Sequence, residues 1–67
     1  MNKIELNVEL ERRRENYSHL AKLLGINYGT ILNKISGRSS FTLPELRNIK
    51  EAWELTNDRF CEIFFAG

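Results

Sequence analysis

The sequence predicts an all-α fold, a compact bundle of about five short helices in a single domain spanning residues 1–67. Apolar residues recur three and four positions apart in several short segments, which is the spacing of one helix face. Residues whose side chains cap a helix N-terminus precede these segments: Asn16, Asn27, Thr42, and either Thr56 or Asn57. Gly25 lies between two of the segments, where it can end a helix with positive φ.

The first element is ambiguous from the sequence. Apolar residues at positions 4 to 10 alternate with polar ones, which by period alone indicates a strand. Leu6 and Leu10 are nevertheless four positions apart, and the Glu- and Arg-rich stretch that follows is a good helix former. We therefore predict a helix from about Asn7 to Glu15, with a short strand over residues 4–8 as the alternative.

Two central helices follow, joined by a short turn. The first begins after Asn16, with Ser18 as a rival cap, and ends at Gly25. Its apolar face is formed by Tyr17, Leu20, Ala21 and Leu24. The turn is Gly25-Ile26-Asn27, so it ends in a side chain that can cap the next helix.

The second central helix is predicted over Tyr28–Ser36, with Ile31 and Ile35 at the centre of its buried arc. Tyr28 and Leu32 lie at the edges of that arc, and the opposite face carries Gly29, Thr30, Asn33 and Lys34. Two helices joined by a short Gly-containing turn form a helix-turn-helix, and the second helix of that motif enters a DNA major groove.

Two further helices are predicted after residue 41. Thr42 and Glu45 form a capping box with Pro44 in the first turn. The stripe that follows is apolar and typical of a core face: Leu43, Leu46, Ile49 and Trp53. Phe41, just before the cap, is expected to pack on the same core.

The last short helix carries Phe60, Ile63 and Phe64 at helical spacing, and the chain ends in Phe64-Phe65-Ala66-Gly67. A small domain cannot easily bury two aromatic rings at its end. We therefore expect an association surface there, for a second copy of the chain or for a different protein.

Composition argues against several classes of protein. A chain of 67 residues buries only ~60% of the surface that its unfolded form exposes, so a partner subunit would help to stabilise it. Cys61 is the sole cysteine, so an internal disulfide is excluded and a reducing cytoplasm is suitable. Because His19 is also the sole histidine, the chain has too few of the usual ligands for a zinc site. No apolar run is long enough for a bilayer, the start lacks the form of a signal peptide, and no catalytic constellation is visible. We expect no metal, no cofactor, no membrane contact and no enzyme activity.

The charges are unevenly distributed. The formal net charge is only +1, yet no Asp or Glu occurs from Asn16 to Pro44. Residues 12–44 contain six basic residues and one acid, Glu15, so their net charge is +5. Residues 1–11 contain one basic residue and three acids, and residues 45–67 contain three basic residues and five acids, so each of these two segments has a net charge of −2. The six bases are Arg12, Arg13, Arg14, Lys22, Lys34 and Arg38. Basic charge is therefore concentrated on the central motif, where phosphates would lie, unless the pattern serves only solubility.

The chain resembles the Cro/repressor class of phage and bacterial helix-turn-helix proteins, the lambda-repressor-like proteins. The residues that carry the resemblance are Leu20-Ala21, Gly25-Ile26, Ile31 and Gly37, then the run Lys34–Leu46 (KISGRSSFTLPEL) and the ending Glu62–Phe65 (EIFF). These last two stretches resemble small Cro-type regulators of temperate phages, so the likeness covers nearly the whole chain. It implies a first helix packed across the motif and a role in the lysis/lysogeny switch in the cytoplasm of a bacterial host.

Four residues of the second motif helix are candidates to contact DNA bases: Tyr28, Gly29, Thr30 and Asn33. Asn33 is the strongest, because its amide can pair bidentately with adenine, and Thr30 can hydrogen-bond a base or phosphate or touch a thymine methyl. Gly29 would permit close backbone approach, and it replaces a long polar side chain of family members, so fewer direct base contacts are expected. Tyr28 is expected to touch a base edge or sugar, with core packing as the alternative.

Six residues are candidates to contact phosphates: Tyr17, Asn27, Lys34, Arg38, Ser39 and Ser40. Tyr17 stands where the family usually carries a phosphate-binding polar residue, and its alternative role is core packing. Arg38 can engage a phosphate bidentately, and the resemblance places the loop 37–40 against the sugar-phosphate backbone, unless it is an ordinary solvated loop. Lys34 is expected to contact phosphate or to be merely solvated. Arg12–Arg14 either contact phosphates or interact with the dipole of the first helix.

The expected function is that of a transcriptional regulator that binds double-stranded operator DNA, as a dimer or a weakly paired monomer. The alternative is a modulator or antirepressor that keeps the fold but acts by binding a partner phage repressor. The modest net charge, Gly29 and the aromatic end all favour that alternative.

Overall fold

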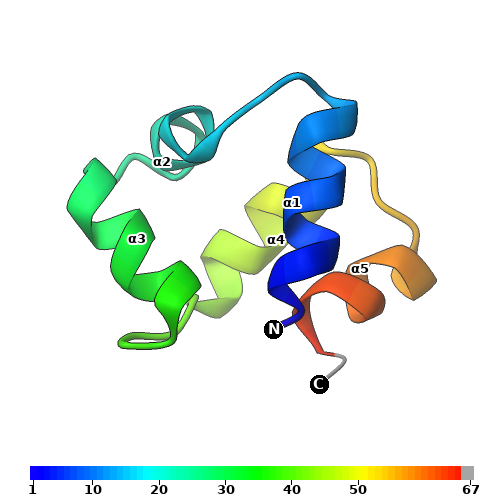
Figure 1. The fold of residues 1–67 in the computed structure, drawn as a ribbon. Coiled ribbons are helices and arrows are strands. Elements are labelled where there is room, and N and C mark those ends of the chain that lie inside the picture. The colour runs from blue at the N-terminus through cyan, green and yellow to red at the C-terminus, as the bar shows by residue number, and fades with distance from the viewer. Residues whose placement is uncertain (66–67) are drawn as a thin grey trace.

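The computed structural model describes residues 1–65, which form five α-helices in chain order (Figure 1). These are α1 (Lys3–Arg12), α2 (Tyr17–Leu24), α3 (Tyr28–Ser36), α4 (Leu43–Ala52) and α5 (Asn57–Phe64). No strand occurs within residues 1–65, so the predicted all-α bundle is confirmed. α2 packs on α3 and on α4, while α1 packs on α5, and Figure 1 shows α3 and α5 at opposite ends of the molecule.

All five helices contribute to one hydrophobic core. Each supplies one side chain that is almost completely buried: Leu6, Leu20, Ile31, Ile49 and Ile63, in chain order. Further buried side chains surround them: Leu10, Ala21, Ile35, Leu46, Trp53 and Phe64. Every helix is therefore anchored in the common core, which fixes the two motif helices on the rest of the domain.

Each helix begins with a side chain that accepts a hydrogen bond from the backbone N–H three residues later. The five caps are Asn2, Asn16, Asn27, Thr42 and Thr56. The last four were predicted, and the capping box of Thr42 with Glu45 is confirmed. The rival caps Ser18 and Asn57 are wrong, because both residues lie inside the first turn of their helices.

The predicted bounds of the first helix are wrong, and so is the strand alternative over residues 4–8. The helix begins at Lys3 because Asn2 caps it, with Oδ1 accepting from the Glu5 N–H at 3.1 Å. The Asn2 N–H also donates to the Ile63 carbonyl at 2.7 Å, which fastens this end to α5. The helix ends at Arg12 rather than Glu15, since Arg14 has a φ of 54° and turns the chain away.

Two predictions about the C-terminal helices also fail. Leu43 is 71% exposed, because it is the first residue of α4 and precedes the part of the stripe that faces the core. Phe64, expected in an exposed aromatic end, is buried and packs edge-on against Phe41 with ring centroids 5.8 Å apart. Phe65 is exposed as expected. Ala66 and Gly67 lie outside the described residues.

Candidate nucleic-acid interface

α2 and α3 are joined by a three-residue turn that does not continue either helix. Gly25 has a φ of 69°, and its N–H donates to carbonyls of the last turn of α2. The Ile26 N–H then donates to the Ala21 carbonyl at 3.0 Å. Asn27 Oδ1 accepts from the Thr30 N–H at 2.7 Å and starts α3. The turn is closed by local hydrogen bonds, so the sequence alone was sufficient to predict it.

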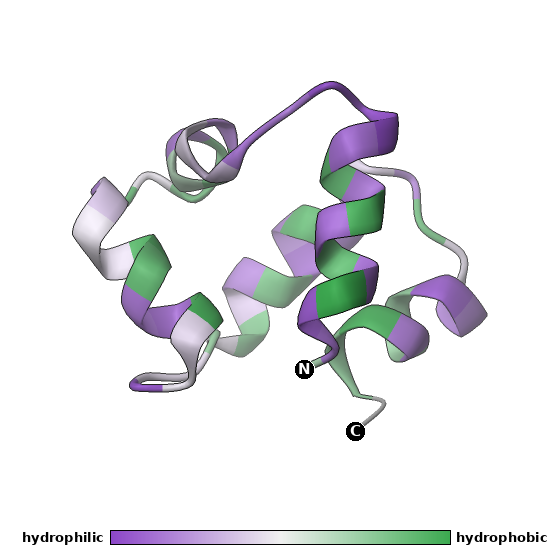
Figure 2. Cartoon of the chain, in the orientation of Figure 1, coloured by the Kyte–Doolittle hydropathy of each residue, from purple (hydrophilic) through white to green (hydrophobic). Residues whose placement is uncertain are grey.

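α3 buries one face and exposes another, as predicted. Ile31 and Ile35 are buried, whereas Gly29 and Asn33 are exposed and Thr30 is half-buried. The first turn of α3 is nearly white in Figure 2, because residues 28–30 have intermediate hydropathy, and none of the three carries a charge. Contacts from this turn would therefore use a phenol, a hydroxyl and the bare backbone at Gly29.

The edges of the buried arc of α3 are open to solvent. Tyr28 is 51% exposed and Leu32 is 38% exposed. Exposure of Tyr28 favours a base or sugar contact over the core-packing alternative. Leu32 adds an apolar side chain to the same surface, at a position where no contact was predicted.

A surface groove of about 660 Å³ runs beside α3. Six of the ten predicted contact residues line it: Tyr17, Asn27, Gly29, Thr30, Asn33 and Arg38. Its other polar or charged lining residues are Lys3 of α1 and Ser36. No carboxylate lines this groove, so its two charged groups, Lys3 and Arg38, both attract anions.

Lys3 is the charged lining residue that sequence reasoning missed. It belongs to the segment whose secondary structure was ambiguous, and the first helix was predicted to begin only at Asn7. The Tyr17 hydroxyl donates to Asn7 Oδ1 at 2.6 Å, which ties α2 to α1 one turn beyond Lys3. This contact between helices has no signal in the local sequence.

The environment of Tyr17 bears on both of its predicted roles, core packing and phosphate contact. Its ring packs against the hydrophobic core, as the core alternative predicted. Tyr17 also lines the groove, but the one hydrogen that its hydroxyl can donate is already given to Asn7. Because a phosphate only accepts hydrogen bonds, a Tyr17 contact with phosphate would require breaking the bond to Asn7.

Lys34 is not on the solvated side of α3, and this expectation is wrong. Its side chain is 10% exposed, and Nζ lies 2.9 Å from Glu45 Oε1. Nζ also donates to the Ser40 carbonyl at 2.9 Å and lies 5.9 Å from the centre of the Phe41 ring. The ammonium therefore joins α3 to α4, and we leave it out of the proposed DNA contacts.

The loop after α3 exposes the side chains of Arg38, Ser39 and Ser40. It begins at Gly37, whose φ is 88°. The N–H groups of Arg38 and Ser39 both donate to the Asn33 carbonyl, at 2.9 and 3.2 Å. These two N–H groups are therefore not free to donate to a phosphate, and the guanidinium and the hydroxyls remain as donors of this loop.

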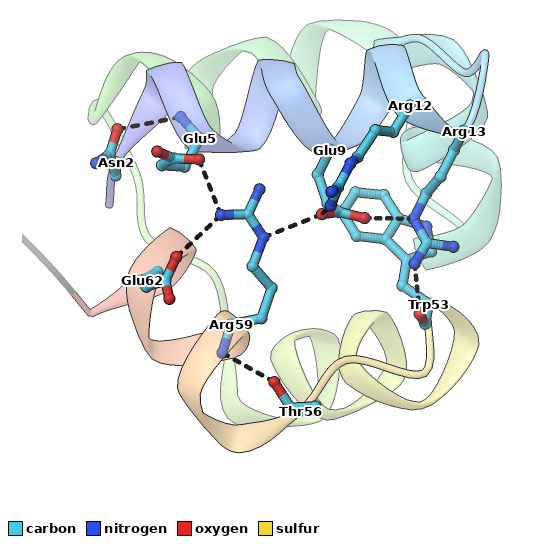
Figure 3. Close-up of polar contacts among 9 residues, drawn as sticks. All are labelled: Asn2, Glu5, Glu9, Arg12, Arg13, Trp53, Thr56, Arg59 and Glu62. Carbon is cyan, nitrogen blue, oxygen red and sulfur yellow. Dashed lines mark hydrogen bonds and ion pairs between the residues drawn. The ribbon is translucent and has the colours of Figure 1, made fainter.

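The arginines at the end of α1 are only partly available. Arg13 Nε lies 3.0 Å from Glu9 Oε2, and its guanidinium lies 5.0 Å from the centre of the Trp53 ring and donates to the Trp53 carbonyl (Figure 3). Arg12 also reaches Glu9, at 3.4 Å, but its side chain is 68% exposed. Arg14 is exposed. Arg13 is thus held by the interior, while Arg12 and Arg14 remain open to solvent.

Glu9 is an acid that the fold buries, since it is only 4% exposed. Arg59 of α5 joins it to Glu5 and Glu62, with distances of 3.0 Å to Glu9 and 2.8 Å to Glu5 (Figure 3). Burial opposes ionisation of Glu9, but hydrogen bonds from Arg59 and Arg13 outweigh it and lower the pKa of this carboxyl. Hydrogen bonds to Glu5 and Glu9 hold the pKa of Arg59 above its usual value.

Apart from the groove, the described residues offer few features that assign a function. Among residues 1–65, no helix is long and apolar enough to span a membrane, and no three His, Cys, Asp or Glu side chains are placed to hold a metal ion. Comparisons with known protein families, curated proteins and solved structures find no match to this chain. A function is therefore argued from the residues and geometry of the groove.

Proposed function

We propose that this chain is a Cro/repressor-class DNA-binding regulator that inserts α3 into the major groove of an operator. The observation that supports this proposal best is the carboxylate-free groove beside the exposed face of α3. Phosphates would be attracted by Lys3 and Arg38, whose charges come from α1 and from the loop after α3. From the resemblance to small Cro-type proteins, we further propose that the chain acts in the lysis/lysogeny switch of a temperate phage in its bacterial host.

The proposed roles follow from side-chain chemistry. Asn33 is exposed and carries the amide that can pair with adenine, so it is the main base reader. Tyr28 and Thr30 make the remaining contacts to base or sugar, and Gly29 lets the backbone come close. Ser39 and Ser40 supply hydroxyls to the sugar-phosphate backbone. Asn27 uses Oδ1 for its cap, so only its NH₂ group would donate to a phosphate.

The proposal is tested by selecting tight-binding sites from a random duplex library with the full chain. The selected duplex and a scrambled duplex are then titrated across salt concentrations. We expect the selected duplex to bind on the order of 10³-fold more tightly and both affinities to fall as salt rises. Recovery of no preferred sequence, or binding that does not respond to salt, would overturn the proposal.

Two variants separate contacts that recognise a base from contacts that bind phosphates on any sequence. Asn33→Ala should cost about 1–3 kcal/mol at one base position and relax the preference there. Arg38→Ala should weaken binding to every duplex and lower the salt slope by about 1. Lys22→Ala, which removes an exposed cation of α2 outside the groove, is the matched control and should change little.

The antirepressor function is favoured by a different observation, the exposed apolar side chains of Tyr28 and Leu32 on α3 itself. An apolar edge on this helix also suits a protein partner. Titration against the repressor of the same phage tests this function. Tight, salt-insensitive binding of the repressor, together with weak DNA binding, would favour the antirepressor function. If repressor binding is lost in Leu32→Ser but kept in Lys3→Ala, the repressor binds at the apolar edge of α3.

A further inference from the structure

The exposed face of α3 presents an amide and an apolar side chain close together. The residues that recur three and four positions apart on this face also line the groove beside α3: Gly29, Leu32, Asn33 and Ser36. Leu32 is 38% exposed, and Asn33 is exposed as well. Helical side chains lean toward the N-terminus of their helix, so Leu32 and Asn33 extend over the turn where Gly29 has no side chain. Both are therefore accessible to a ligand that approaches this face.

α3 offers no cation to a guanine. In the major groove guanine presents only acceptors, N7 and O6, and the commonest specific contact to them comes from Arg or Lys. Lys34 is the only charged residue of α3, and its ammonium is held by Glu45 at 2.9 Å. Ser36 Oγ donates its hydrogen to the Asn33 carbonyl at 3.2 Å, so this hydroxyl is engaged as well. The two cations that line the groove come from α1 and from the loop after α3, outside the inserted helix.

The same face offers no carboxylate to a cytosine. Cytosine presents its N4 amino group, which is a donor, and Glu or Asp is the side chain that accepts from it. No carboxylate of residues 1–65 lines the groove, and α3 contains no acid. A G·C pair would therefore meet neither of the charged side chains that usually recognise its two bases.

Both bases of an A·T pair find a matching group on this face. Adenine presents an acceptor at N7 and a donor at N6, which the Asn33 amide matches bidentately. Thymine presents a methyl group at C5, which apolar side chains contact. Leu32 supplies such a side chain, and a contact between the two would remove apolar surface of both from water.

We propose that the base pairs contacted by α3 are A·T pairs, and that Leu32 recognises the methyl group of a thymine neighbouring the adenine that Asn33 reads. This class of operator is inferred on the basis of the proposed DNA-binding function. Tyr28 and Thr30 suit the same class, because an aromatic ring and a threonine methyl also contact thymine methyls. Phosphate contacts from outside α3 add affinity on any sequence and carry no sequence information.

Selection from a random duplex library gives the first readout. The positions contacted by α3 are those whose base preference relaxes in Asn33→Ala or Leu32→Ala. We expect A·T pairs at these positions. A preferred site with G·C pairs there overturns the A·T assignment and leaves the proposed function standing, whereas recovery of no preferred sequence overturns the proposed function itself.

Deoxyuridine gives the second readout, because it removes only the C5 methyl of thymine and keeps the base pair. The thymines of the selected duplex are replaced one at a time, and each duplex is titrated with the full chain. At a contacted thymine the dissociation constant should rise about fourfold, the effect expected for one buried methyl group. Thymines outside the contacted positions should tolerate the replacement. An unchanged dissociation constant at every thymine overturns the methyl contact.

Leu32→Ala assigns the methyl contact to this residue. In this variant the thymine and deoxyuridine duplexes should bind equally, because the side chain that distinguishes them is removed. Val8→Ala is the matched control: Val8 is apolar and 41% exposed, but it lies on α1 outside the groove, so the difference between the duplexes should persist. An undiminished difference in Leu32→Ala at every contacted thymine, with helix content by circular dichroism unchanged, overturns the role of Leu32.

Discussion

The Lys34 ammonium lies 2.9 Å from Glu45 Oε1, and this same oxygen accepts the Thr42 N–H at 2.9 Å. One carboxylate thus completes the cap of α4 and binds a cation of α3. Burial opposes ionisation of Glu45, but hydrogen bonds from Thr42 and Lys34 outweigh it, so the pKa of this carboxyl is lowered. The end of α3 and the start of α4 are held together at this point.

Lys34→Met should therefore destabilise the domain. We expect a loss of about 1–2 kcal/mol in the free energy of unfolding, because a largely buried, charge-assisted contact is removed. Urea denaturation measures it. Lys22→Met, on the exposed side of α2, should change the free energy of unfolding by less than about 0.5 kcal/mol. Equal stability of Lys34→Met and wild type would show that the ion pair contributes nothing.

Gly29→Ala should raise stability and weaken DNA binding. A Cβ at Gly29 would meet Asn27 Oδ1 at 3.5 Å, an ordinary contact, so the variant should gain about 0.5–1 kcal/mol from helix propensity. The added methyl projects from the face proposed to approach DNA. Thermal unfolding and DNA titration of the same samples measure the two effects. Unchanged DNA affinity would contradict close backbone approach at Gly29.

Gly25→Ala tests the left-handed backbone conformation of the turn between α2 and α3. Open space surrounds the site of its Cβ, but the φ of 69° is left-handed, so the variant should lose about 1 kcal/mol through backbone strain alone. A gain in stability here would show that the turn can change conformation.

Lys3→Ala should weaken binding to all duplexes and lower the salt slope by about 1, because Lys3 lines the groove beside α3. Stability should be unaffected, since the side chain is exposed. DNA titration across salt concentrations, compared with Lys22→Ala, measures the effect. If both lysine variants behave alike, Lys3 has no special place in the interface.

Glu9 should make the domain sensitive to acid. Its folded-state pKa lies below its ordinary value of 4.5, so its stabilising contribution is complete above 4.5 and is lost as the pH falls through the folded-state pKa. Glu9→Gln should cost about 3 kcal/mol at neutral pH, because it leaves Arg13 and Arg59 without a buried partner. Urea denaturation as a function of pH should give a shallower acid dependence in this variant.

Glu11→Gln is the matched control, since Glu11 is exposed and forms no ion pair among residues 1–65. An acid dependence of Glu9→Gln identical to that of wild type would contradict the assignment.

The sequence by itself determined the features that depend on neighbours three or four residues away. The caps at Asn16, Asn27, Thr42 and Thr56, the turn at Gly25 and the buried pair Ile31 and Ile35 are of this kind. A cap joins a side chain to a backbone N–H three positions later, and a helix face repeats with the helix period, so local order is enough to reveal both.

Only the tertiary structure decided which charges are free and which are engaged. Arg13 is held by Trp53, 40 residues away, and Arg59 by Glu9, 50 residues away. Lys34 meets Glu45 only because the fold brings the end of α3 next to the start of α4, and Lys3 lines the same groove as Tyr17 because α1 is joined to α2 through Asn7. These pairings depend on how distant segments pack around a common core, and no local spacing in the sequence encodes that arrangement.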